Sequence, residues 1–147
     1  MGAVAAVWPL MLGGLFLVIK SLHPFGAYYD TGELLVYPDP AVQGDIRLEY
    51  NGRTLREFKG KYSVIVRGFK DNVIACDASS AVFTYRTDSV RPEVLTMEWW
   101  APGDPRCANL PAGTYEMETC WTIVDLGPWG FLPNETECVT TPAFRVS

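Results

Sequence analysis

The chain's four cysteines are the residues with the clearest chemistry. Cys76, Cys107, Cys120 and Cys138 are separated by 31, 13 and 18 residues. No two of them form the Cys-x-x-Cys pair typical of structural zinc sites, so the spacing does not favour a metal centre. An even number of cysteines is typical of disulfide-bonded domains in an oxidising compartment. We therefore predict two disulfide bonds and no metal.

The pairing of these cysteines depends on the strands that contain them. If residues 114–124 pair antiparallel with residues 135–146, Cys120 lies almost opposite Cys138. Cys76 would then pair with Cys107. Four cysteines allow three pairings, and the sequence does not decide among them.

The residues needed for catalysis are sparse. His23 is the only histidine, and it lies outside the β-rich part of the chain. A Ser-His-Asp or Cys-His triad in that part would lack its base. Carboxylate pairs such as Glu116 with Glu118 and Glu135 with Glu137 suit acid-base chemistry in principle, but residues two apart on a strand face are ordinarily solvated. We predict that the protein is not an enzyme and has no cofactor.

Apolar residues in two places are candidates for binding a protein partner. The segment 125–133 is expected to connect two strands, and connections usually lie on the surface. The alternative is that this loop folds back and caps one end of the domain. In the Trp99-Trp100 pair, a strand would turn one indole outward, and we take Trp100 as a further candidate. The complete candidate set is Trp100, Leu126, Trp129, Phe131 and Leu132.

The elements that position these residues are predicted to be strands. Short apolar runs alternate with turn residues, and no segment has a helical period over residues 28–147. In the clearest strand, 114–124, every second residue from Tyr115 to Ile123 faces one way. The other expected strands are 34–37, 45–50, 62–67, 73–77, 81–86, 94–100 and 135–146.

This pattern predicts an all-β fold. Roughly seven to nine strands with regular turns are typical of an immunoglobulin-like antiparallel two-sheet sandwich. The cysteine, tryptophan and tyrosine spacing of antibody domains is absent, so the expectation concerns the architecture alone.

The N-terminal segment differs from the rest of the chain. Residues 3–19 are uncharged and apolar, and Lys20 ends the run. As a helix they would be about 25 Å long, close to the roughly 30 Å of a bilayer core. We predict a transmembrane helix and short linker over 1–27 and a β-sandwich domain over 28–147. One alternative is a cleaved signal peptide, which would need basic residues before the apolar run, and none occurs there. The other alternative is an N-terminal helix that is buried in protein.

The membrane orientation rests on two opposing signals. Lys20 alone would place the domain in the cytoplasm, whereas the four cysteines favour an oxidising compartment. We give the cysteines more weight and predict a single-pass membrane protein with an extracytoplasmic domain, or alternatively a virion-associated one. Residues 3–19 would contact membrane lipid or neighbouring transmembrane helices.

Charge is distributed unevenly along the chain. Seven of the twelve basic residues lie between Arg47 and Lys70, whereas Arg106 is the only basic residue among six acidic ones between Asp104 and Glu137. The net charge of −5 argues against nucleic-acid binding. A two-signed surface suits a homo-oligomer or multi-copy assembly packed head to tail, although it also occurs on ordinary soluble domains.

These observations predict a binding protein. We expect a non-enzymatic, membrane-anchored β-sandwich that acts as a structural or adhesive interaction subunit of a larger envelope or virion assembly. The alternative function is that of an accessory or inhibitory subunit of a membrane enzyme complex.

Overall fold

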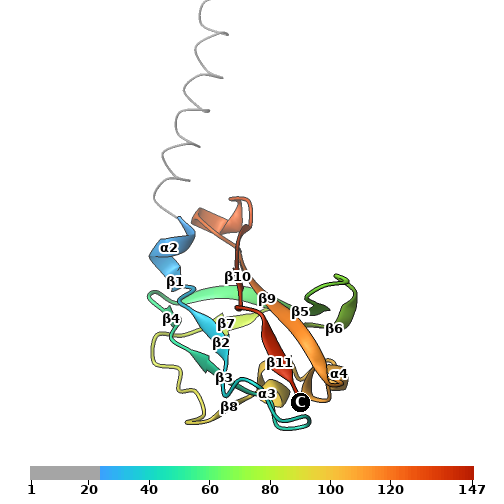
Figure 1. Cartoon of the computed structure of the whole chain (residues 1–147). Helices are drawn as coiled ribbons and strands as arrows, with labels where there is room; N and C mark the ends of the chain where they lie inside the picture. Colours follow the sequence, from blue (N-terminus) through green and yellow to red (C-terminus); the bar gives the residue numbers. More distant parts are fainter. Residues whose placement is uncertain (1–23) are drawn as a thin grey trace, which may run out of the picture.

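The computed structural model describes residues 24–147, and the hydrophobic run 3–19 lies outside the described residues. The described part is mostly β-structure in three sheets, which confirms the all-β prediction (Figure 1). Within residues 24–147, no helix is long and apolar enough to cross a membrane.

The elements are short apart from two long strands. The strands are β1 (Tyr29–Asp30), β2 (Leu34–Val36), β3 (Arg47–Tyr50), β4 (Arg53–Thr54), β5 (Phe58–Gly68), β6 (Ile74–Ser79), β7 (Phe83–Tyr85), β8 (Leu95–Thr96), β9 (Gly113–Val124), β10 (Glu135–Thr140) and β11 (Phe144–Val146). The helical turns are α2 (Phe25–Tyr28), α3 (Met97–Trp100), α4 (Pro105–Ala108) and η1 (Pro128–Gly130).

The largest sheet is built around β5 and β9. These strands pair antiparallel from Lys59 opposite Val124 to Gly68 opposite Tyr115. Strands β10 and β11 pair with β9, while β6 and β7 pair with β5. Along β9, alternate side chains from Tyr115 to Ile123 are buried, which confirms the predicted face.

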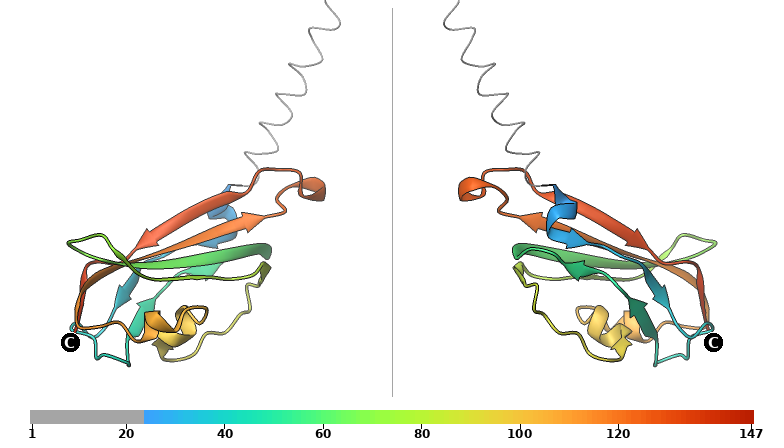
Figure 2. Two further views of the ribbon diagram at one scale, coloured as in Figure 1. Left: turned by 90° about the vertical axis from the view of Figure 1, so that its right-hand side faces the viewer. Right: turned by 90° about the vertical axis from the view of Figure 1, so that its left-hand side faces the viewer.

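A second layer covers the inner face of this sheet. It contains the three-stranded sheet β2-β3-β8 together with α3 and α4, as Figure 2 shows in side view. The two layers share one hydrophobic core. The large sheet contributes Val64, Val66, Met117 and Ile123, and the small sheet contributes Leu34, Val36, Leu48 and Leu95. Burial of this apolar surface is the main favourable term in folding.

The helical turn α2 joins the packed domain at its N-terminal end. Phe25 and Tyr28 are buried. The Phe25 ring packs edge-on against Tyr29, and the Tyr28 ring packs edge-on against Phe58. The core therefore includes Phe25, which the sequence prediction placed in the linker.

The prediction of a strand over 94–100 is wrong for the second half of that segment. Strand β8 ends at Thr96, and helix α3 begins at Met97. The Thr96 hydroxyl accepts a hydrogen bond from the Trp99 backbone N–H (3.2 Å) and caps the helix. As a result, Trp100 is buried and Trp99 is partly exposed, the reverse of the orientation that a strand would give.

The disulfide pairing favoured by the strand register is confirmed. Cys120 on β9 and Cys138 on β10 are direct cross-strand partners with Cα atoms 4.0 Å apart. The second disulfide joins Cys76 on β6 to Cys107 on α4, with Cα atoms 5.3 Å apart.

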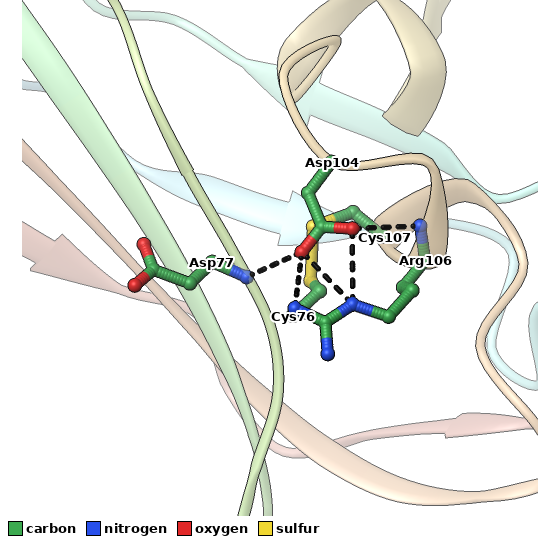
Figure 3. Close-up of polar contacts among 5 residues, drawn as sticks. All are labelled: Cys76, Asp77, Asp104, Arg106 and Cys107. Atoms are coloured by element: carbon green, nitrogen blue, oxygen red, sulfur yellow. Dashed lines mark hydrogen bonds and ion pairs between the residues drawn. A yellow bond between two sulfur atoms is a disulfide. The ribbon is translucent and has the colours of Figure 1, made fainter.

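A polar contact accompanies the second disulfide (Figure 3). Asp104 is the N-cap of α4, and its carboxylate accepts a hydrogen bond from the Asp77 backbone N–H of β6 (3.1 Å). The Arg106 guanidinium donates to the same carboxylate, with a shortest distance of 2.7 Å. The Arg106 hydrogen bonds hold the pKa of Asp104 well below its usual range. This carboxylate and the disulfide together fasten α4 to the edge of the large sheet.

Candidate functional sites: a hairpin tip and an aromatic pocket

The segment 125–133 forms the tip of the β9–β10 hairpin. Four of its residues have positive φ, namely Asp125, Gly127, Trp129 and Gly130. For Asp125 (54°) and Trp129 (56°) this conformation is uncommon, and it is held by the tight turn around them. A Cβ at Gly127 would lie 2.6 Å from the Leu132 side chain, so only glycine fits there. We call residues 125–133 the hairpin tip.

The apolar side chains of the hairpin tip divide into two groups. Leu126 and Leu132 are buried and form an isolated bridge, in which the Leu132 N–H donates to the Leu126 carbonyl (3.1 Å). Trp129, by contrast, is 98% exposed and Phe131 is 50% exposed. The two leucines close the neck of the loop, and the two aromatic side chains stand in solvent.

The five residues predicted to bind a partner therefore do not form one continuous surface. Trp100, Leu126 and Leu132 are buried in the core, because Trp100 packs under β9 and the leucines fold back. Only Trp129 and Phe131 are available to a partner. Leu126 and Leu132 fold back, as in the alternative considered for this loop, whereas Trp129 and Phe131 stay on the surface.

The hairpin tip lies at the end of the domain where the described chain begins. In Figures 1 and 2 the tip and α2 occupy the same end of the molecule, and α2 packs against β10. The neighbouring charge is mixed: Asp125, Glu135 and Glu137 lie at or next to the tip in the sequence, and Lys59 and Lys61 of β5 lie opposite Val124 and Thr122 of β9. The tip therefore presents its exposed aromatic side chains beside charges of both signs.

A second feature, which the sequence did not predict, is a cavity of about 460 Å³. It lies between the large sheet and the loop 86–94 that joins β7 to β8, drawn in yellow-green in Figure 1. Eight of its eighteen lining residues are aromatic. They come from six elements of the fold and are Tyr29, Tyr50, Tyr62, Phe83, Tyr85, Trp99, Trp100 and Trp121. We call this cavity the aromatic pocket.

The rings of the aromatic pocket are held in fixed stacks. Tyr50 stacks on Trp121 with centroids 5.6 Å apart, and Tyr85 stacks on both Phe58 (4.6 Å) and Phe83 (4.3 Å). Such pairs add to the stability gained from burial. Contacts between rings therefore hold the aromatic part of the wall in place.

Four tyrosine hydroxyls add polarity to this wall. The Tyr29 and Tyr50 hydroxyls share a hydrogen bond of 2.8 Å. The Tyr85 hydroxyl is buried and has no hydrogen-bond partner among residues 24–147. Burial raises the pKa of Tyr29, Tyr50, Tyr62 and Tyr85, so all four remain neutral at physiological pH.

Three arginines line the aromatic pocket. Arg91 fixes loop 86–94, because it donates to the Gly52 carbonyl (2.6 Å) and its guanidinium lies 5.0 Å from the centre of the Tyr50 ring. Arg53 and Arg86 form no ion pair within the described residues. No aspartate or glutamate is among the residues that line the pocket.

The two carboxylate pairs considered for chemistry are not brought together, because Glu116 and Glu118 lie on the outer face of β9 while Glu135 and Glu137 pair with Ile123 and Trp121 of the buried face. Glu118 lies near the sulfurs of Cys120 and Cys138, but those sulfurs are bonded to each other and are not free to bind a metal. Glu118 forms an ion pair with Arg67 (3.8 Å) on the neighbouring strand instead. This geometry matches an ordinary sheet surface.

Comparison of the chain with models of protein families, with curated proteins and with solved structures finds no match.

Proposed function

We propose that this protein is a membrane-anchored, non-enzymatic β-domain that acts by binding a protein partner through Trp129 and Phe131. In this proposal residues 3–19 span the membrane and the domain is extracytoplasmic. The protein serves as a structural or adhesive subunit of an envelope or virion assembly, and its two layers form an immunoglobulin-like sandwich. The paired cysteines support the oxidising side of the membrane.

The observation that carries the proposal is the exposure of Trp129 on a constrained loop. A large apolar side chain that is 98% exposed gains nothing from folding. Its backbone is held in a left-handed conformation by a turn whose two leucines are packed in the core. Strain that presents an aromatic side chain to solvent is characteristic of functional sites.

The position of the hairpin tip supports a partner near the membrane. Residues 20–23 reach at most about 14 Å when fully extended. If residues 3–19 span the membrane, α2 and the adjacent tip lie close to its surface. Charges of both signs lie beside the tip, from Asp125 and Glu135 and from Lys59 on the neighbouring strand. Such a surface suits a protein partner that has an apolar contact area and complementary charges around it.

The test is copurification of the full chain from its native membranes. We expect the double variant Trp129→Ala with Phe131→Ala to lose its partner while keeping both disulfides and the wild-type near-UV circular dichroism. The matched control is Val73→Ala with Ile74→Ala, which removes two exposed apolar side chains from β6 and the turn before it. Retention of the partner by the tip variant would contradict the proposal.

The same experiment separates the assembly role from the alternative accessory role. A structural subunit copurifies in many copies with particles or with itself. An accessory or inhibitory subunit copurifies one to one with a membrane enzyme.

A further inference from the structure

The aromatic pocket has the features of a ligand site separate from the hairpin tip. We propose that it binds a small anion with a planar aromatic body, such as an aromatic carboxylate. The stacked rings receive the aromatic body, and Arg53 and Arg86 receive the charge. This inference goes beyond the proposed function and does not depend on it.

The size and lining of the pocket support a small organic ligand. Its volume of about 460 Å³ lies within the range of roughly 300–1,000 Å³ typical of small-molecule sites. Such sites combine apolar walls with a few polar groups that set orientation. Here Trp99 and Phe83 line the pocket and are each partly exposed, and an aromatic ligand pairs with such rings in stacked or edge-on geometry.

The positive charge of the residues that line the pocket favours a negatively charged ligand. The chain has a net charge of −5, yet the pocket is lined by arginines without a carboxylate. Asp30, the cross-strand partner of Arg53, accepts a hydrogen bond from the Gly32 N–H (3.0 Å) and does not line the pocket. Asp88 in loop 86–94 is also outside the lining. A planar guanidinium fits a carboxylate well.

The experiment is calorimetric titration of the full chain in nonionic detergent. The probes are 2-naphthoate, the neutral 2-naphthamide, the cationic 2-naphthylmethylammonium and the non-aromatic octanoate. We expect 2-naphthoate to bind one to one and at least tenfold more tightly than each of the others. The heat of titrating each probe into detergent without protein corrects for its partition into the micelles.

Three variants divide the binding into its parts. Arg53→Ala with Arg86→Ala should weaken 2-naphthoate binding at least tenfold and leave 2-naphthamide binding unchanged, because neither arginine makes an ion pair with any residue of 24–147. Trp99→Ala should weaken both probes, because Trp99 is partly exposed and contributes to the wall. The control Arg145→Ala removes an exposed arginine outside the pocket and should change neither affinity.

Several results would overturn this proposal. They are the absence of saturable 2-naphthoate binding, equal affinity for the cation or for octanoate, and an Arg145→Ala effect equal to that of the double arginine variant. The chain could also self-associate and bind 2-naphthoate only after Trp129→Ala. The pocket would then hold the hairpin tip of a second copy, and the small-anion assignment would be wrong.

Discussion

The Trp100 indole N–H donates a hydrogen bond of 3.0 Å to the Thr119 hydroxyl, and both side chains are buried. The contact joins α3 to the middle of β9, and so fixes one wall of the aromatic pocket to the largest sheet. It also places Trp100 edge-on to Trp121, with ring centroids 6.3 Å apart.

Replacement of Trp100 by phenylalanine should destabilise the domain. The variant keeps an aromatic ring but loses the indole donor and leaves the Thr119 hydroxyl without this partner. We expect the free energy of unfolding to fall by about 1–3 kcal/mol. The control Trp99→Phe, in a partly exposed position, should change it by less than about 0.5 kcal/mol. Urea unfolding of the full chain measures both, and equal values would show that the hydrogen bond contributes little.

The thiol state of the native protein should report its compartment. We expect the intact mass, after acid quenching and alkylation, to show no alkylated cysteine, because Cys76–Cys107 and Cys120–Cys138 are both bonded. Addition of four alkyl groups would place the domain in a reducing compartment and would favour the orientation indicated by Lys20.

Asp104 should make stability depend on pH in the acid range. Its pKa is lowered in the folded state, chiefly by the Arg106 hydrogen bonds, relative to about 3.9 when unfolded. The unfolded chain therefore binds the proton first. The stabilisation is fully present above about pH 5 and is lost progressively as pH falls through the unfolded pKa toward the folded one. Asp104→Asn should be less stable than wild type at pH 7, with the gap narrowing at pH 3. The exposed Asp45→Asn is the control, and a pH-independent gap for Asp104→Asn would contradict this account.

Arg91 should govern the opening of loop 86–94. Removing its side chain in Arg91→Ala eliminates the hydrogen bond to Gly52 and the contact with the Tyr50 ring, which together contribute about 1–2 kcal/mol. Amide hydrogen exchange in the loop should then quicken roughly tenfold. In the control Arg56→Ala, which loses a similar contact with Tyr28, the loop should exchange at the wild-type rate. Unchanged exchange in Arg91→Ala would show that other contacts hold the loop.

Sequence patterns predicted the parts of the fold that depend on local periodicity. The alternation along β9 determines its buried face, and the pairing of β9 with β10 brings Cys120 opposite Cys138. Both follow from the two-residue period of a strand. The immunoglobulin-like arrangement and the transmembrane helix stay predictions.

Other features depend on contacts between distant residues, which a single sequence does not display. The alternation in 94–100 resembles a strand, but the Thr96 cap and the burial of Trp100 against Thr119 make it a helix after Thr96. In the hairpin tip, Leu126 and Trp129 are equally apolar in sequence, and only the turn conformation separates buried from exposed. The aromatic pocket combines rings from Tyr29 to Trp121. Its only sequence signal is an aromatic content of 13%, which gives no location.

The most direct test of partner binding through the hairpin tip is photocrosslinking in the native membrane. A benzophenone amino acid replaces Trp129 in the full chain, and the same replacement at Val73, which is 62% exposed, is the control. The account predicts a discrete protein adduct from position 129 and none from position 73. Absence of an adduct at 129, an adduct with lipid alone, or the same adducts from both positions would contradict it.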